Sequence, residues 1–286
     1  MSKTLVVESG STKSDWVVLE NGQSKLQFQS KGWNPLFMNA EDMIRRLNSY
    51  HDLMPFRESI GHVYFYAPGC SYKASKDVLK EVLEGVFVNA VVELESDLLA
   101  AARATFIDKP LFVSILGTGS NTAFYDGEII EPLNPSLGYI LGDEGSGASL
   151  GKVILKAYLY KKLPVDLYTE FSKEYSISTD LVLRSVYRQE NPNRFLASYV
   201  PFLVKHKTST FVKELVEKEF EDYLQTHLMS NPMKVDFSVA FVGSVAFYFQ
   251  DFLSELCLQK NISISRIVKS PIQGLIDFHT NTPSRF

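Results

Sequence analysis

The sequence is poor in the features that mark disulfide-bonded, zinc-binding or membrane-spanning proteins. Only Cys70 and Cys257 are cysteines, and neither forms a CxxC motif or has a histidine at metal-ligand spacing, which argues against a disulfide framework and a structural zinc site. The apolar runs 111–116 and 239–242 have strand length, far short of the roughly 20 residues that a membrane helix needs. The first residues lack the apolar stretch of a secretory signal. We therefore expect a cytoplasmic protein with free thiols and no membrane partner.

Excess positive charge is also missing. The chain has 29 Lys and Arg against 33 Asp and Glu, a formal net charge of -4, so no basic surface for nucleic acid is expected. With 286 residues, of which 45% are hydrophobic, the chain is long enough for two domains with buried cores. The expected partner is a small molecule.

Three stretches share one outline, a short apolar run that ends in a glycine-containing turn with hydroxyl or amide side chains. They begin at Thr4, Leu111 and Val239. After the first two, the chain continues into a second apolar run followed by Asn21-Gly or Asp126-Gly, which are strong turn signals. This repetition, about half a chain apart, predicts a β-hairpin at the start of each of two α/β domains.

The remaining pattern is mostly helical. Apolar spacing and helix formers predict helices over 40–50, 75–85, 96–105 and 148–162. We place the domain boundary at Asp108-Lys-Pro, which gives an N-terminal domain of residues 1–108 and a C-terminal domain of residues 109–286. The second domain is expected to carry a helical insertion over about 150–231, with breaks at Pro192 and Pro201.

The first turn, Glu8-Ser-Gly-Ser-Thr-Lys, has the composition of a phosphate-binding loop. Successive amides, hydroxyls and a Lys ammonium bind phosphate oxygens, and a carboxylate at the strand end can hold a hydrated Mg²⁺. The turn leads into a strand and lacks GxxxxGK, so it is not a Walker A loop. Taken alone, it could equally be an ordinary hairpin turn.

Three further motifs extend this chemistry. Gly117-Thr-Gly-Ser-Asn repeats the first turn in the second domain, and two such loops predict a site that grips a polyphosphate. Gly142-Asp-Glu-Gly-Ser-Gly is either a capped helix start or a site where Asp143 accepts hydrogen bonds from sugar hydroxyls. Gly243 either lets a flat base approach the backbone or packs a helix on a strand.

Together these motifs resemble those of a known superfamily. The turns at Glu8, Gly117 and Gly243 are similar to the phosphate-1, phosphate-2 and adenosine motifs of the actin/hexokinase/Hsp70 sugar kinase superfamily, in the same order over nearly the whole chain. Gly142-Asp-Glu-Gly-Ser-Gly, Gly32-Trp-Asn-Pro and the closing Ser270-Pro-Ile-Gln-Gly-Leu resemble the N-acetylglucosamine kinase branch of the BadF/BadG/BcrA/BcrD ATPase family. The resemblance implies an α/β fold of two ribonuclease-H-like domains around a central cleft, with the last helix packing on the N-terminal domain.

The resemblance also implies an activity: an ATP- and Mg²⁺-dependent kinase that phosphorylates the 6-hydroxyl of N-acetylglucosamine or a related amino sugar. A homodimer is suggested by the same analogy. The catalytic base would be Asp97, which by position alone is a helix-capping residue beside Ser96, and Glu8 would hold the metal through water. The residues implied for ATP and its phosphates are Ser9, Gly10, Ser11, Thr12, Lys13, Gly117, Thr118, Gly119, Gly243 and Ser244. Those implied for the sugar are Asn34, Gly69, Ser120, Asn121 and Asp143.

One residue departs from the family pattern. Glu8 stands where the first phosphate motif usually has Asp, and Mg²⁺ tolerates misplaced ligands poorly. This departure supports the second of two alternatives that stay open. The first is an ATPase activator of the BadF/BcrA type, which would need cluster-ligating cysteines that Cys70 and Cys257 do not resemble. The second is a catalytically inactive sugar- or nucleotide-binding sensor.

Trp16 and Trp33 are predicted to be packing residues.

Overall fold

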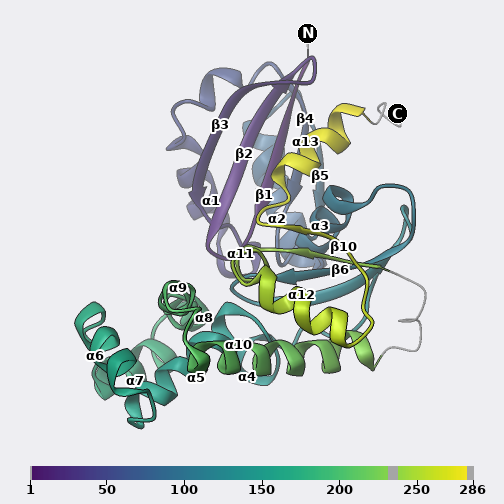
Figure 1. Cartoon of the computed structure of the whole chain (residues 1–286). Coiled ribbons are helices and arrows are strands. Elements are labelled where there is room, and N and C mark those ends of the chain that lie inside the picture. Colours follow the sequence, from purple (N-terminus) through teal and green to yellow (C-terminus); the bar gives the residue numbers. More distant parts are fainter. Residues whose placement is uncertain (1, 231–237, 282–286) are drawn as a thin grey trace. The chain divides into compact units, whose positions relative to one another are not determined.

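The computed structural model describes residues 2–230 and 238–281 (Figure 1). The chain divides into two compact units, Met1–Ile107 with Pro271–Phe286, and Asp108–Ser270. The sequence-predicted boundary after residue 108 lies one residue from this division. Across the described ranges, no helix combines the length and the apolar character needed to cross a bilayer.

The first unit alternates strands and helices after an opening run of three strands. Its elements are β1 (Lys3–Ser9), β2 (Lys13–Glu20), β3 (Gln23–Lys31), η1 (Pro35–Phe37), α1 (Ala40–Asn48), η2 (Met54–Phe56), β4 (Ile60–Tyr66), α2 (Lys73–Val86), β5 (Val91–Glu95), α3 (Asp97–Thr105) and α13 (Ile272–Asn281).

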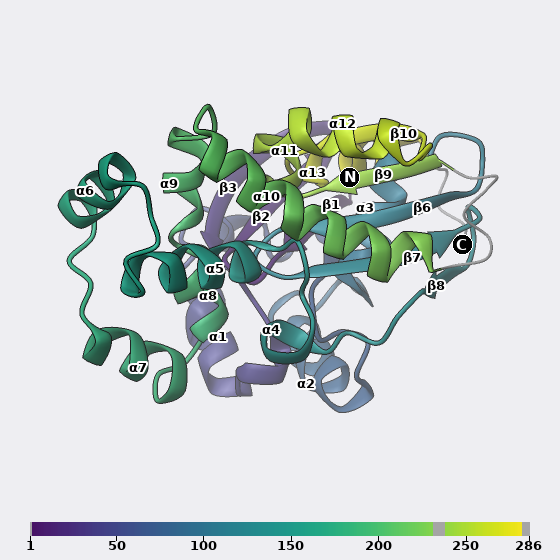
Figure 2. The same cartoon turned by 60° about the horizontal axis from the view of Figure 1, so that its bottom comes forward.

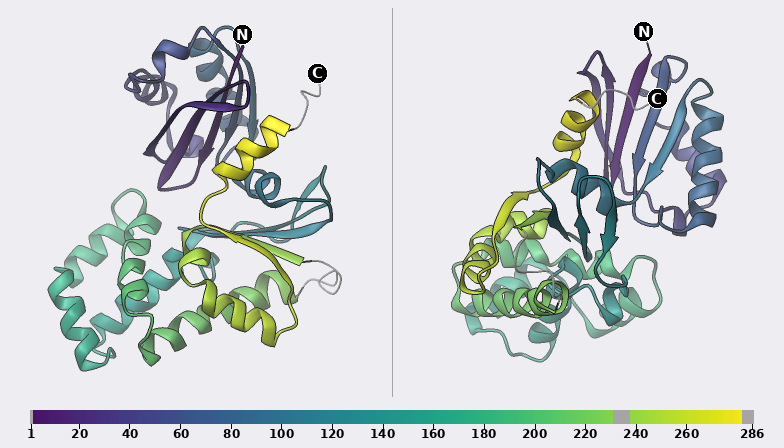
Figure 3. Two further views of the ribbon diagram at one scale, coloured as in Figure 1. Left: turned by 45° about the horizontal axis from the view of Figure 1, so that its top comes forward. Right: turned by 90° about the vertical axis from the view of Figure 1, so that its right-hand side faces the viewer.

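The sheet of the first unit has the strand order β3-β2-β1-β4-β5. β1 is antiparallel to β2 and parallel to β4. Because successive side chains of a strand point to opposite faces, Leu5 and Val7 join one core with residues of α1 and α2, whereas Val6 joins another with residues of α3 and α13. The right-hand view of Figure 3 shows this sheet between α2 (blue) and α13 (yellow). Trp16 and Trp33 are fully buried in the first of these cores, as predicted.

The last helix belongs to the first unit although it comes from the far end of the chain. Gly274 of α13 lies so close to α3 that a Cβ there would be 2.3 Å from the carbonyl oxygen of Ala104. Tyr66, at the end of β4, holds the helix with its hydroxyl 2.8 Å from Nε2 of His279, and the same hydroxyl accepts a 2.8 Å hydrogen bond from Arg103. Burial and the nearby Arg103 lower the pKa of His279 to about 3. The imidazole is therefore neutral at ordinary pH.

The second unit repeats the opening run of three strands and then carries a long helical segment. Its elements are β6 (Leu111–Leu116), β7 (Ser120–Tyr125), β8 (Ile130–Pro132), α4 (Gly138–Leu141), α5 (Gly147–Leu159), α6 (Val165–Glu174), α7 (Thr179–Tyr187), α8 (Pro192–Ala197), α9 (Val200–Lys205), α10 (Thr210–Tyr223), η3 (Leu224–Met229), β9 (Ser238–Val242), α11 (Ser244–Tyr248), α12 (Gln250–Gln259) and β10 (Ile264–Val268).

The sheet of the second unit has the order β10-β9-β6-β7-β8. β6 is antiparallel to β7 and parallel to β9, just as β1 is to β2 and β4. Each sheet is thus an antiparallel run of three strands to which two parallel strands are added beside the first. The predicted α/β fold of two ribonuclease-H-like units is confirmed.

The helical segment between β8 and β9 packs into one large core with the second sheet. Within the second unit, Figure 2 shows α6 and α7 well away from the strands β6, β7, β9 and β10. Pro192 and Pro201 lie in the first turns of α8 and α9. Proline is tolerated there because the first amides of a helix have no intrahelical acceptor.

Candidate functional site

The turn between β1 and β2 is a compact loop of residues 9–13. The amide of Gly10 donates to the carbonyl oxygen of Lys13 at 2.9 Å. Gly32 lies against the loop, because a Cβ there would be 2.3 Å from the carbonyl oxygen of Gly10. Ser11 is half-buried, and Thr12 and Lys13 are exposed. These three residues present the polar groups that a phosphate could reach.

Ser9 is fully buried, and its hydroxyl is occupied within the protein. It accepts from the amide of Trp33 at 2.7 Å and from the hydroxyl of Ser14 at 2.7 Å, and it lies 2.9 Å from the carbonyl oxygen of Trp33. The side chain of Ser9 therefore ties the loop to the segment that carries Gly32-Trp-Asn-Pro. We assign Ser9 to the shaping of the loop.

Glu8 lies directly opposite Asp15 in the β1–β2 hairpin, and both side chains are buried. Burial, followed by the negative charges of Asp15 and Asp97, raises the pKa of Glu8 to about 8, while Lys13 opposes this shift. Asp15 is held by Lys13 at 3.2 Å and by the amide of Gln29 at 2.6 Å. The sequence motifs do not single out Asp15, although the register of the predicted hairpin places it opposite Glu8.

Asp97 is the first residue of α3, but it is not the residue that caps the helix. The cap is Ser96, whose hydroxyl accepts from the amide of Leu99 at 3.2 Å. One carboxylate oxygen of Asp97 accepts from the amide of Leu98 at 3.0 Å. Desolvation raises the pKa of Asp97 to about 6 despite this hydrogen bond. Asp97 is thus a carboxylate that is more basic than usual and still ionised at neutral pH.

Asn34 and Gly69 come together in the first unit. Gly69 has a φ of +87°, and a Cβ there would lie 2.6 Å from Oδ1 of Asn34. That oxygen accepts from the amide of Leu36 at 3.0 Å, which fixes the direction of the side chain. The Asn34 amide nitrogen then remains as a donor for a ligand oxygen, since within the described ranges it has no hydrogen-bond partner.

In the second unit, the turn between β6 and β7 is fixed to the start of α5. The carbonyl oxygens of Gly117 and Thr118 accept from the amides of Gly147 and Ala148 at 2.8 and 3.0 Å. The loop 117–119 therefore lies at the N-terminus of a helix of 13 residues, where the helix dipole favours negative charge. The amides of Gly147 and Ala148 are already paired with the loop, so it is the helix dipole that favours a phosphate here.

Asp143 lies beside this loop. One of its carboxylate oxygens accepts from the amide of Ser120 at 3.2 Å, and a Cβ at Gly119 would be 3.1 Å from the same carboxylate. Burial raises the pKa of Asp143. The hydroxyl of Ser120 is buried and has no hydrogen-bond partner among the described residues, which is rare in a folded protein and leaves this hydroxyl able to bond a ligand. Asn121 is half-buried next to them on β7.

Gly243 joins β9 to α11 and lies against the end of β6. Its φ is +127°, and a Cβ there would be 2.3 Å from the carbonyl oxygen of Leu116 and 3.1 Å from the amide nitrogen of Gly117. Ser244, the first residue of α11, is exposed. The structure thus brings Gly117, Gly119, Asp143 and Gly243 together in one part of the second unit.

The contacts of Gly243 lead to a stability prediction. Replacing Gly243 by Ala should destabilise the protein by at least about 2 kcal/mol, because the backbone conformation is strained for an L-residue and the methyl group meets backbone atoms. The matched control is Gly85→Ala near the end of α2, where a Cβ meets nothing within 4 Å and the substitution should be neutral or stabilising. Thermal unfolding of both variants tests this, and equal melting temperatures would contradict it.

The residues present fit a hydrated Mg²⁺ better than a cation held by protein atoms alone. Among the described residues, no group of three or more His, Cys, Asp or Glu side chains could hold a metal ion. Mg²⁺ usually keeps several waters and is bound through one or two carboxylates together with substrate phosphates. Glu8, at the end of β1 beside the loop 9–13, offers such a carboxylate once it loses the proton that its pKa of about 8 retains at neutral pH.

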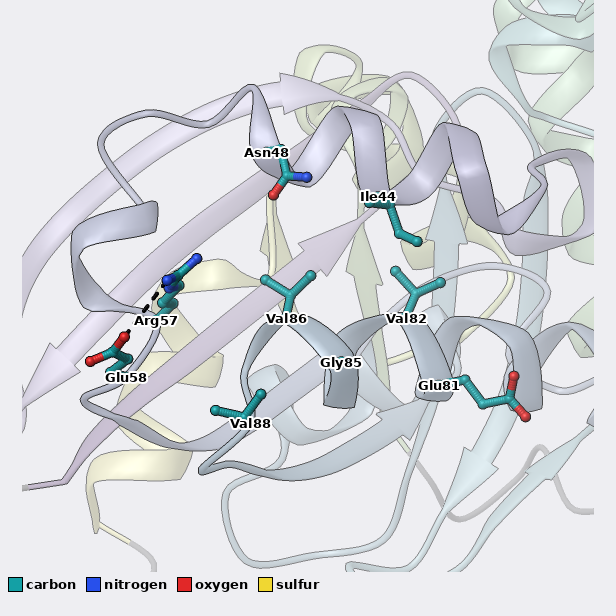
Figure 4. A pocket seen from close by; sticks show the side chains of 9 residues that line it. All are labelled: Ile44, Asn48, Arg57, Glu58, Glu81, Val82, Gly85, Val86 and Val88. Atoms are coloured by element: carbon teal, nitrogen blue, oxygen red, sulfur yellow. Dashed lines mark ion pairs between the residues drawn. The ribbon is translucent and has the colours of Figure 1, made fainter.

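A separate pocket of about 500 Å³ lies in the first unit between α1 and α2. Figure 4 shows Ile44 and Asn48 of α1 facing Val82 and Val86 of α2 across it. None of the predicted site residues lines this pocket. This surface pocket is therefore separate from the candidate site residues of both the first and the second unit.

The known proteins that resemble this chain are found among solved structures. No family model and no curated protein matches the sequence. Among solved structures, the "Putative N-acetylglucosamine Kinase" from Porphyromonas gingivalis is 36% identical, with a TM-score of 0.90 over 98% of this chain and 99% of that one. A second protein of that name, from Chromobacterium violaceum, is 16% identical with a TM-score of 0.63 over 97% of this chain and 99% of the other.

More distant structures share the fold alone. A ROK family glucokinase from Streptomyces griseus, solved in complex with glucose and AMPPNP, is 15% identical with a TM-score of 0.56 over 97% of this chain and 98% of the other. The fold of the present chain is thus that of sugar kinases. The similarity to the Porphyromonas protein extends beyond the fold to the sequence.

Proposed function

Because this chain belongs to the N-acetylglucosamine kinase-like proteins of the BadF/BadG/BcrA/BcrD ATPase family, we propose that it transfers the γ-phosphoryl group of ATP to the 6-hydroxyl of an amino sugar such as N-acetylglucosamine. The observation that carries the proposal is the raised basicity of the Asp97 carboxylate, which is not needed to cap α3. Asp97 is a desolvated carboxylate with a pKa of about 6, and Ser96 relieves it of the capping role. A general base needs this combination of basicity and ionisation at neutral pH.

In this reaction, Asp97 accepts the proton of the sugar 6-hydroxyl as the oxygen forms its bond to the γ-phosphorus and the bond to ADP breaks. Asn34 donates to a sugar oxygen, while Asp143 accepts from sugar hydroxyls. Ser120 contributes a hydroxyl that has no other partner among the described residues. Positioning and charge neutralisation supply most of the catalysis in phosphoryl transfer.

The phosphates are assigned to the two loops. In the first unit, Ser11, Thr12 and Lys13 offer polar groups at the surface of the loop 9–13. In the second, the loop 117–119 lies at the N-terminus of α5. Mg²⁺, bound to Glu8 through water, would neutralise charge on the phosphate oxygens. The adenosine is assigned to the surface at Gly243 and Ser244.

The cysteines argue against the activator alternative. Cys70 and Cys257 are both buried, and desolvation raises the pKa of each thiol to about 12. Cluster ligation requires thiolates, so neither residue is suited to that role.

The test is an assay of ADP release from MgATP with N-acetylglucosamine, glucosamine, N-acetylmannosamine, glucose or no sugar. We expect turnover that depends on an amino sugar. Equal turnover without sugar would support an ATPase instead. Binding of ATP or sugar by calorimetry without any turnover would support a sensor.

A further inference from the structure

A carboxylate–imidazole pair lies next to Asp143 and has no part in the roles assigned above. Nε2 of His227 is 3.1 Å from Oε2 of Glu144, the residue that follows Asp143. His227 is 8% exposed, and Glu144 is half-buried. His227 comes from η3, a π-helical turn that continues α10. Such turns are rare and frequently occur at functional sites.

The hydrogen bonds around His227 define its tautomer. The side-chain nitrogen of Asn134 donates to the carbonyl oxygen of Thr226 at 3.2 Å and lies 3.3 Å from Nδ1 of His227. Because a carbonyl oxygen only accepts, it orients the Asn134 amide with its NH₂ group toward the ring. Nδ1 is therefore the acceptor, and Nε2 carries the hydrogen that is donated to Glu144. The Glu144–His227 bond is thus directional and charge-assisted.

This bond holds a loop whose backbone is strained. Asp143 has a φ of +60°, in the left-handed region that side chains other than glycine adopt at a cost in free energy. Such a conformation persists only where the surroundings enforce it. Gly145, two residues on, has a φ of +67° and packs on α10 so closely that a Cβ would be 2.9 Å from Cβ of Tyr223.

The same helix provides both supports of the loop. The ring of Tyr223 stacks on His227 with 4.9 Å between centroids, and its hydroxyl is 2.5 Å from that of Thr122 on β7. The segment 223–227 therefore connects the strand that carries Ser120 and Asn121 to the loop that carries Asp143.

We propose that Glu144 and His227 are positioning residues for the sugar, which hold Asp143 in its left-handed conformation so that its carboxylate is preorganised to accept sugar hydroxyls. This inference rests on the proposed function. Neither residue acts on the reacting atoms. Their loss should weaken sugar binding in the ground state and the transition state alike, which raises the sugar KM and leaves kcat and the ATP KM nearly unchanged.

The experiment compares two substitutions of His227. His227→Phe keeps a ring to stack on Tyr223 and removes the donor, whereas His227→Gln supplies an N–H at a similar reach from the backbone. We expect the sugar KM to rise about tenfold in His227→Phe, the loss typical of one hydrogen bond to a charged group, and to recover most of the way in His227→Gln. Sugar Kd values from calorimetry should change in parallel.

A double-substitution cycle and a control separate positioning from general damage. Glu144→Ala removes the other half of the pair. The sugar KM of the His227→Phe/Glu144→Ala protein should therefore be no higher than that of either single variant. His206→Phe is the matched control, since His206 also packs its ring on an aromatic residue, Phe202, at 4.3 Å, and it has no contact with the loop among those described. We expect its sugar KM to be that of the wild type.

The outcomes distinguish this inference from the proposed function. A wild-type protein without sugar-dependent turnover contradicts both. If the wild type turns over sugar and His227→Phe has an unchanged sugar KM, only the positioning role is wrong. It is also wrong if His227→Gln is no better than His227→Phe, or if kcat and the ATP KM change as much as the sugar KM.

Discussion

Replacing Asp97 by Asn is expected to lower the kcat of sugar-dependent ADP release by roughly 10²- to 10⁴-fold, the usual contribution of a general base. Asn has nearly the same shape as Asp but cannot accept the proton of the sugar hydroxyl. The substitution should leave the fold intact, because Ser96 caps α3 and its hydrogen bond to the amide of Leu99 does not involve Asp97. Sugar and ATP should still bind.

Steady-state kinetics and calorimetry on the same preparation test this prediction. Asp77→Asn is the matched control, since Asp77 is an exposed carboxylate on α2 whose one ion pair among the described residues is with Lys73, four residues earlier. It should have wild-type kcat. If Asp97→Asn kept more than about a tenth of the wild-type kcat, Asp97 would not be the base. If it lost sugar binding, Asp97 would act in binding.

The hairpin that opens each unit could be predicted because its signals are local. Alternating apolar residues and the Asn21-Gly and Asp126-Gly pairs lie within a few residues of each other, and Asn21 and Gly22 both adopt the positive φ that such turns require. β4 and β5 were not predicted. β4 includes Gly61 and His62, and β5 alternates over only five residues. Their strand conformation depends on pairing with β1 and with each other.

The site shows the same limit. Residue types and spacing predicted the two loops, and the structure gives them the compact geometry described above. Residue types and spacing could not predict that the hydroxyl of Ser9 is hydrogen-bonded to Trp33, because the two residues are 24 positions apart in the sequence. The contact between Glu144 and His227 spans 83 positions. Such pairs arise from tertiary packing and leave no local pattern in the sequence.

Replacing Glu8 by Gln is expected to flatten the pH dependence of stability between about pH 6.5 and 8. The folded protein holds a proton on Glu8 up to a pKa of about 8, whereas the ordinary value is 4.5. Between these values the folded state binds more protons than the unfolded state. The free energy of unfolding therefore falls as pH rises, at up to about 1.4 kcal/mol per pH unit from this one group. Gln is neutral throughout and removes this contribution.

The titration of Asp97 contributes little to the pH dependence of stability in this interval, because its pKa of about 6 places most of its effect at lower pH. Urea unfolding at pH 6.5 and 8 should show the wild type losing more stability than Glu8→Gln across this interval. Glu190→Gln makes the same chemical change at an exposed position, and it should follow the wild type. A wild-type slope equal to that of Glu8→Gln would mean that Glu8 is ionised in the folded protein. An ionised Glu8 would release no proton when a magnesium nucleotide binds, whereas a protonated Glu8 must release one. Calorimetry in buffers of different ionisation enthalpy would detect this proton release.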